Sequence, residues 1–278
     1  MSRLLCALLL GLTACSGASS GGGGRPEVVA SFYPLAFLAR EVGGTDVEVT
    51  DLTPAGTEPH DIELSPSRVA RLADADLVFF LGGFQPAVED AIEASGVDGV
   101  DLLDDITAPG DPHVWLDPAA MQELLDRVLL HVSALDTDRA ADFRNRARAL
   151  NGELIRLDAL YETGLADCRE RDLVVSHEAF GHLAARYGLE QIGISGVDPE
   201  AEPGPGRLAE VAELARERGV ETIFFERLVS PDVAEALARE VGANTAVLDP
   251  IEGEPETGDY VAAMEDNLQA LRDGLRCR

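Results

Sequence analysis

The stretch Asp76–Leu81, DLVFFL, is a continuous apolar run behind a single acidic residue. A strand covered by helices on both faces needs such an unbroken run, whereas a strand with one wet face alternates apolar and polar residues. Similar runs lie on either side of it, EVVASF at Glu27–Phe32 and GVDLL at Gly99–Leu103, with helical patterns between them. Strands that alternate with helices in this way predict a parallel, doubly wound α/β sheet.

The same alternation starts again after a long helical interval. Strand-like runs recur at Leu173–Ser176, Glu221–Phe225 and Asn244–Leu248. Between the halves, an apolar stripe at helical spacing extends from Arg139 to Leu165, which corresponds to a helix of about 40 Å. We therefore predict an α/β protein of two doubly wound lobes with parallel sheets, joined by one long spine helix. The predicted parts are an N-terminal lobe at residues 26–137, a linking helix at 138–166 and a C-terminal lobe at 167–278.

The chain is strongly acidic. It has 51 Asp and Glu residues against 22 Arg and no Lys, which gives a formal net charge of -29. Because phosphate backbones repel such a surface, nucleic acid is excluded as a partner. The same charge favours nearby cations, although salt screens that field within roughly 8–10 Å.

The start of the chain has the pattern of an exported lipoprotein. Arg3 precedes the apolar run Leu4–Gly11, which is shorter than the roughly 20 residues that a bilayer span needs. The following LTAC, which ends at Cys15, resembles a bacterial lipobox, whose cysteine is lipidated. We expect residues 1–14 to be a signal peptide and residues 15–25 a lipidated Ser/Gly tether. The protein would then be extracytoplasmic, anchored to the outer face of the bacterial cell membrane; ordinary secretion with an incidental Cys15 is the alternative.

The cysteines agree with export. Of the four, Cys6 leaves with the signal peptide and Cys15 carries the lipid, so that two remain. Cys168 and Cys277 can then form a disulfide in an oxidising compartment. Two buried free thiols are the alternative.

Three of the five histidines, His60, His113 and His177, each follow a predicted strand, and Asp249 ends another. Loops at the carboxyl ends of strands converge on the binding crevice of an open α/β sheet. Three neutral imidazoles and a carboxylate would fill a four-coordinate zinc site, and imidazole suits borderline transition metals. Residue types and spacing alone leave two interpretations open, a metal site and a set of structural histidines.

The other two histidines are predicted to pack. His177-Glu178 with His182 is similar to a zinc-protease helix, but that motif needs its two histidines four residues apart. A separation of five residues places the side chains about 140° apart around a helix. His131 lies within an amphipathic helical pattern.

Six stretches in a fixed order carry a family resemblance: EPHDIELSPS, DPHVWLDP, SHEAFGHLAARYGL, ISGVDPEAEPGPGRLAEV, FFER and VLDPI. Over residues 25–278 the chain resembles the metal-binding lipoproteins of zinc/manganese ABC importers, the ZnuA- and TroA-like substrate-binding family. The resemblance implies that His60, His113 and His177 are metal ligands and that Asp249 completes or caps the shell. It also implies that Trp115 and the two Asp-Pro turns around it pack the loop that presents His113.

The resemblance favours zinc over manganese. Manganese-preferring members have Glu where this chain has His177, and exchange of oxygen for nitrogen favours zinc. Zinc members often insert a His-rich loop before DPHVWLDP, whereas this chain has DDITAPGD, whose Asp104, Asp105 and Asp111 are expected to be solvated turn residues. Glu58 is expected at the rim of the site and Glu226 beneath it.

The implied function is capture of Zn²⁺ between two lobes by a monomer that is not an enzyme. The ion is then delivered to an ABC permease driven by its ATPase subunit, because this chain has no Gly-rich P-loop of its own. The alternatives are a manganese-binding importer component, a zinc-dependent hydrolase with Glu58 or Glu178 as general base, and a surface adhesin.

Overall fold

A computed structural model describes residues 24–103 and 110–278 of the chain. The predicted signal peptide, most of the tether with Cys15, and the turn residues Asp104 and Asp105 lie outside the described residues. In the described part, no helix combines the length and the apolar character needed to cross a bilayer.

The N-terminal lobe is built on a four-stranded parallel sheet with the order β2-β1-β3-β4. Its strands are β1 (Glu27–Ala30), β2 (Glu48–Asp51), β3 (Leu77–Phe80) and β4 (Gly99–Asp101). In register, Val28 of β1 is opposite Val49 of β2 and Leu77 of β3. Between β1 and β3 the order of the strands changes direction across the sheet. At such a switch point a crevice forms outside the carboxyl ends of the strands.

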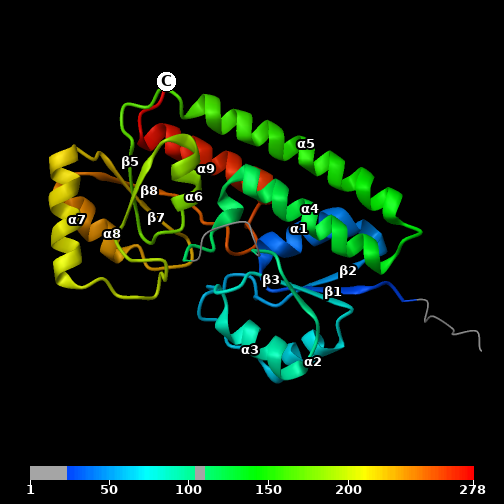
Figure 1. The fold of residues 1–278 in the computed structure, drawn as a ribbon. Helices are drawn as coiled ribbons and strands as arrows, with labels where there is room; N and C mark the ends of the chain where they lie inside the picture. The colour runs from blue at the N-terminus through cyan, green and yellow to red at the C-terminus, as the bar shows by residue number, and fades with distance from the viewer. Residues whose placement is uncertain (1–23, 104–109) are drawn as a thin grey trace, which may run out of the picture.

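Alternate residues of β3 enter two different cores. Leu77 and Phe79 pack with α1 (Tyr33–Gly43) and α4 (Pro118–Leu135). Val78 instead packs with α2 (Pro66–Asp74) and α3 (Pro86–Ser95), which lie below the sheet in Figure 1. The sheet is therefore covered on both faces, as the apolar run DLVFFL predicts.

The C-terminal lobe repeats this topology, with the order β6-β5-β7-β8 and all strands parallel. One face is covered by α7 and α8 and the other by α6 and α9. The strands are β5 (Asp172–Val175), β6 (Glu190–Gly193), β7 (Thr222–Phe225) and β8 (Asn244–Val247). The helices are α6 (Gly181–Tyr187), α7 (Pro205–Arg218), α8 (Asp232–Val241) and α9 (Tyr260–Gly274).

The long helix α5 (Ala140–Gly164) connects the lobes, which confirms the predicted architecture. It packs against α1 and α4 of the first lobe and α9 of the second, along the upper edge in Figure 1. Tyr161 in α5 donates a hydrogen bond to the carbonyl oxygen of Met264 in α9, at 2.7 Å. One cluster of buried apolar side chains extends from β1 through α4 and α5 to β5 and β7. This shared core opposes wide separation of the lobes.

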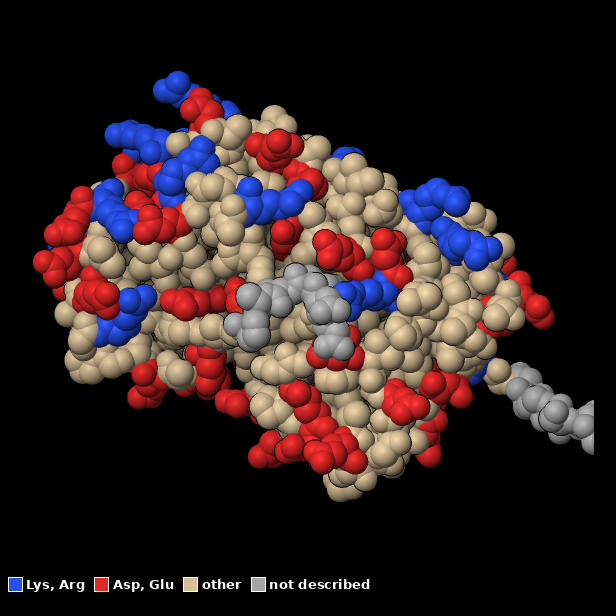
Figure 2. All heavy atoms as spheres, viewed as in Figure 1, with Lys and Arg blue, Asp and Glu red and all other residues tan. Residues whose placement is uncertain are grey.

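Charged side chains are spread over the surface. Figure 2 shows Asp and Glu on both lobes of the face in view, with Arg interspersed along its upper part. Several of these Arg residues form exposed ion pairs, such as Arg156 with Glu265 and Arg216 with Glu240, both at 2.7 Å. Exposed pairs of this kind contribute little stability, and their main effect is to keep the surface hydrated.

The predicted disulfide between Cys168 and Cys277 is present. It joins the segment after α9 to the segment before β5, where the two cysteines also form an isolated antiparallel bridge. The bond closes a loop with a sequence separation of 109 residues. It therefore ties the C-terminal helix to the start of its lobe.

Reduction of this disulfide should lower the free energy of unfolding by about 4–5 kcal/mol, because the reduced chain regains the entropy of a loop of this length. Urea unfolding with and without reductant measures the difference. The double variant Cys168→Ser/Cys277→Ser is the control and should show no dependence on reductant. Equal unfolding midpoints for the oxidised and reduced protein would contradict a stabilising role.

Candidate metal centre

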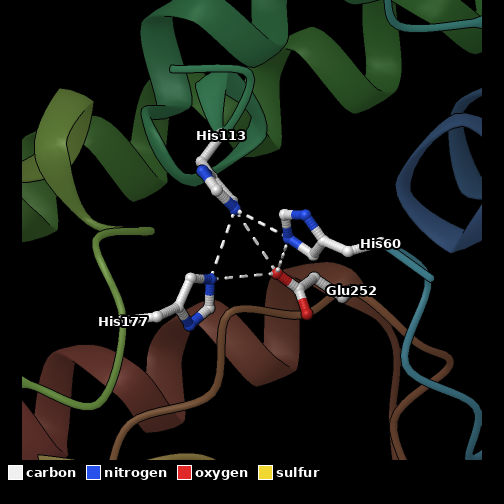
Figure 3. A group of neighbouring side chains, drawn as sticks. All are labelled: His60, His113, His177 and Glu252. Atoms are coloured by element: carbon white, nitrogen blue, oxygen red, sulfur yellow. Dashed lines mark hydrogen bonds and ion pairs between the residues drawn. The ribbon is translucent and has the colours of Figure 1, made fainter. Parts of the chain in front are cut away.

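The three predicted histidines meet between the lobes (Figure 3). His60 lies in the loop after β2, and His113 directly precedes the short 3-10 turn Val114–Leu116. His177 follows β5 by two residues. Each therefore comes from a loop near the carboxyl end of a sheet. The side chains of His113 and His177 are fully buried, and that of His60 is 9% exposed.

A buried carboxylate, Glu252, completes the cluster (Figure 3). The Nε2 atom of His113 lies 3.3 Å from Nε2 of His60 and 3.3 Å from Nε2 of His177. Glu252 Oε1 lies 3.4 Å from Nε2 of His60 and of His177, and 3.5 Å from Nε2 of His113. All four ligand atoms are within 4.8 Å of one another.

Five of the six distances between these atoms, at 3.3–3.5 Å, are close to those of a tetrahedral zinc shell, and the sixth, between Nε2 of His60 and Nε2 of His177, is at most 4.8 Å. Zinc binds imidazole nitrogen and carboxylate oxygen at about 2.0–2.1 Å, so that tetrahedral ligands lie roughly 3.3–3.4 Å apart. Glu252 Oε1 is also buried and has no hydrogen-bond partner among the described residues. A buried carboxylate oxygen without a donor is costly, and a cation at the centre of the cluster would satisfy it.

Asp249, the carboxylate expected in the shell, lies outside the cluster. Its Oδ1 accepts the backbone N–H of Ile251 at 2.8 Å, and its Oδ2 lies 3.2 Å from Arg227 Nε. Its carboxylate is thus used to shape the loop that carries Glu252. Glu252, which follows VLDPI directly, is not predicted as a ligand by the sequence pattern, because a strand end predicts where a loop begins and not which residue of it turns inward.

Two further carboxylates orient the imidazoles. The Nδ1–H of His113 donates to Asp111 Oδ1 at 2.8 Å, and the Nδ1–H of His177 donates to Glu226 Oε1 at 2.7 Å. Such outer partners fix the ring orientation and leave Nε2 free for a metal. Glu226 lies beneath the site as expected. Asp111 is not a solvated turn residue, and Gly181 permits its position, since a Cβ there would lie 2.6 Å from Asp111 Oδ2.

The carboxylates also change the protonation of the centre. Burial alone lowers the pKa of His177, but its contacts with Glu226 and Glu252 outweigh burial and raise the pKa to about 10. Burial also lowers the pKa of His113, but the hydrogen bonds of its ring with Asp111 and Glu252 outweigh burial and raise the pKa. Burial raises the pKa of Glu252, yet the three imidazoles hold it well below its usual range. The metal-free centre therefore binds protons at neutral pH.

The remaining candidates lie around the cluster. His182 Nε2 is 3.0 Å from the carbonyl oxygen of Asp111, outside the group of four. Because α6 begins at Gly181, His177 is in a loop, and the expected helical angle between it and His182 does not apply. Glu58 accepts the backbone N–H of His60 at 3.0 Å, so that it holds the loop and not the ion. His131 lies on α4 near Phe79, away from the site.

Trp115 packs the loop that presents His113. Its ring packs against those of Phe32 and Phe84, with centroid distances of 4.7 and 5.2 Å, and is 5.1 Å from the ring of His113. Its Nε1–H donates to the carbonyl oxygen of Pro250 at 2.7 Å. The Asp-Pro step after it begins α4, where Asp117 accepts the N–H of Ala119 at 2.8 Å.

The chain has clear relatives in sequence. Residues 28–274 match the family described as ZnuA, zinc-uptake complex component A, periplasmic. Zinc-binding lipoprotein AdcA of Streptococcus pneumoniae is 33% identical over 297 residues, which cover 96% of this chain and 59% of that protein. The chain thus spans about three fifths of AdcA. High-affinity zinc uptake system protein ZnuA of Bacillus subtilis is 31% identical over 306 residues, which cover 98% of this chain and 96% of that protein.

Solved structures agree with these matches. The laminin-binding protein Lmb of Streptococcus agalactiae is 32% identical, with a TM-score of 0.85 over 90% of this chain and 99% of that one. The Zn(II)-bound ZnuA-like domain of Streptococcus pneumoniae AdcA is 34% identical, with a TM-score of 0.80 over 91% of this chain and 99% of that domain. The family match and the relatives above 30% identity extend over nearly the whole described chain, and the protein belongs to the ZnuA family of zinc-uptake components.

Proposed function

We propose that this protein is the extracytoplasmic zinc-binding component of an ABC-type importer. One Zn²⁺ would be captured between the lobes by His60, His113, His177 and Glu252. The observation that carries the proposal is the buried group of three Nε2 atoms and one carboxylate oxygen, Glu252 Oε1, which has no hydrogen-bond partner among the described residues. The names of AdcA and ZnuA support zinc as the ion.

The donor set favours zinc over manganese. Zinc accepts a four-coordinate shell of nitrogen and oxygen atoms, whereas manganese prefers more oxygen ligands in a larger shell. Three of the four donors here are imidazole nitrogens, and three of the four side chains are at most 1% exposed. Such burial leaves little room for the additional waters that manganese would bring.

The same closure favours binding over catalysis. Catalytic zinc sites keep one coordination position open for water, whereas this shell is completed by four protein atoms. Glu58 is hydrogen-bonded to the backbone of its own loop, which leaves it poorly suited to act as a general base. An adhesin activity, which the description of Lmb includes, would be a separate property of the outer surface.

Delivery needs partners that this chain does not contain. We expect a lipid anchor at Cys15, followed by the tether at residues 15–25, to hold a monomer near an ABC permease and its ATPase subunit. Because the two lobes share one core, we expect capture and release by limited rocking, with the ion favouring the closed state.

Ligand variants test the site. His177→Ala should weaken zinc binding more than about 100-fold, since even loss of an outer partner costs 10–100-fold. The matched variant His182→Ala removes an imidazole that lies outside the cluster and should change affinity only slightly. Competition with a zinc-binding dye measures both, and equal losses would mean that the cluster is not the site.

The choice of carboxylate is tested in the same way. Glu252→Gln should weaken zinc binding by about 100-fold or more, because the amide is a poor ligand and leaves the shell without negative charge. Asp249→Asn keeps an oxygen that can accept the N–H of Ile251 and should retain most of the affinity. A larger loss for Asp249→Asn than for Glu252→Gln would return the ligand role to Asp249.

Acid should weaken binding. Since the pKa of His177 is raised to about 10 in the metal-free protein, zinc must displace a proton from the centre at neutral pH. Affinity should therefore fall with decreasing pH, by about tenfold per unit for each proton released. Calorimetry in buffers of different ionisation enthalpy counts those protons. An affinity that stays constant between about pH 7.5 and 5 would contradict histidine ligation.

Competition between metals tests the choice of ion. Native mass spectrometry of metal-free protein mixed with equal amounts of Zn²⁺ and Mn²⁺ should show one bound zinc per chain. The variant Glu252→Gln is the control. Zinc that the wild-type protein binds and this variant does not is assigned to the centre and not to surface carboxylates. Preferential uptake of manganese would favour the manganese-binding alternative.

A further inference from the structure

The segment that carries Glu252, residues 249–252, is held by side chains from distant parts of the chain. Asn267 of α9 accepts the N–H of Asp249 at 2.9 Å and donates to its carbonyl oxygen at 2.6 Å. Asp249 accepts the N–H of Ile251 at 2.8 Å, and Trp115 donates to the carbonyl oxygen of Pro250 at 2.7 Å. The N–H and carbonyl of Asp249, the carbonyl of Pro250 and the N–H of Ile251 are thus all hydrogen-bonded.

The backbone of this segment needs such support. Ile251 is fully buried and has a φ of 54°, in the left-handed region that β-branched residues rarely adopt. A strained residue persists only where its surroundings over-determine it. The turn at Ile251 comes directly before Glu252, so the groups that hold the turn also determine where the carboxylate lies.

Of the three side chains that hold this segment, Trp115 alone comes from the N-terminal lobe. Asp249 and Asn267 belong to the C-terminal lobe, whereas Trp115 follows His113 by two residues and packs against Phe32 and Phe84 of the N-terminal lobe. Its indole N–H therefore joins the backbone that presents His113 to the segment that presents Glu252. Both partners of this hydrogen bond are buried.

We propose that Trp115 is a positioning residue of the metal centre, whose indole N–H holds the 249–252 segment so that Glu252 Oε1 lies within ligand distance of the three imidazoles. The proposal rests on the zinc-binding function proposed above. It assigns the effect to one N–H and not to the aromatic ring. A phenyl ring could keep contacts with Phe32 and Phe84, but it would leave the buried carbonyl of Pro250 without a donor.

Trp115→Phe tests the role of the N–H. Its zinc affinity, measured by dye competition, should fall by about 10–100-fold, the usual effect of losing an outer partner of a metal ligand. Tyr161→Phe is the matched control, because it also removes one buried donor to a backbone carbonyl, at 2.7 Å on Met264, while keeping the ring. That control should bind zinc like the wild-type protein.

The spectrum of bound Co²⁺ gives a readout that general destabilisation would not change. Four-coordinate Co²⁺ absorbs visible light far more strongly than Co²⁺ with five or six ligands. The wild-type protein should show the strong bands, and Trp115→Phe should move toward the spectrum of Glu252→Gln. A wild-type spectrum in Trp115→Phe would overturn the proposal.

A double-mutant cycle tests whether Trp115 acts through Glu252. In a Glu252→Gln background, Trp115→Phe should cause little further loss of zinc affinity, because the carboxylate that it positions is already absent. The same fold loss in both backgrounds would mean that the indole acts on the site by another route, and would overturn the proposal.

An isosteric replacement covers the case in which Trp115→Phe does not fold. Trp115 is the chain's single tryptophan, so global incorporation of benzothienylalanine changes this position alone and replaces the N–H by sulfur at almost constant shape. It should show the same loss of affinity and the same Co²⁺ spectrum. If the benzothienylalanine protein and the wild-type protein both bind zinc tightly, the positioning role of Trp115 is refuted and the proposed function stands. If the wild-type protein itself does not bind zinc, the proposed function is refuted as well.

Discussion

The metal centre depends on one buried carboxylate oxygen that lies among three imidazoles. Glu252 Oε1 is surrounded by three imidazole nitrogens at 3.4–3.5 Å and has no hydrogen-bond donor among the described residues. In the metal-free protein Glu226 and Glu252 raise the pKa of His177, and the imidazoles lower the pKa of Glu252, so that the centre holds protons in place of a metal. A divalent cation would replace those protons, so protons and metal compete for the same donor atoms.

The rest of the fold holds these side chains close together in fixed positions. The strands of two sheets with the same topology point their carboxyl ends toward the site between the lobes. Helix α5 and the apolar core that both lobes share hold the lobes together. Outside the four ligand atoms, Asp111 and Glu226 orient two of the rings, and Trp115 and Asn267 hold the segment with Glu252. The centre is thus supported from both lobes, which is compatible with the proposed capture and release of one ion by limited rocking.

Much of this could be predicted from the sequence because it depends on local patterns. The apolar run at β3 and the alternation of strands with helices predicted two parallel sheets, and the stripe along α5 predicted the connecting helix. The helical angle predicted between His177 and His182 was wrong: α6 begins at Gly181, since the chain after β5 first forms the loop that carries His177. The positions of three histidines after strands indicated a shared crevice but left structural histidines as an alternative, and the family resemblance predicted their role as ligands.

What the sequence by itself determined is therefore the order of the elements, which two cysteines remain to pair and which imidazoles follow strands toward the crevice. Only the tertiary structure decided the carboxylate. Asp249 and Glu252 are three residues apart on one irregular loop, and the direction of each depends on the turn at Ile251. That turn is held by Asn267 and Trp115, whose hydrogen bonds reach across 18 and 135 positions of the chain. No local pattern encodes contacts over such separations, because the bonds of Asn267 form only when the C-terminal lobe has folded and that of Trp115 only when both lobes have.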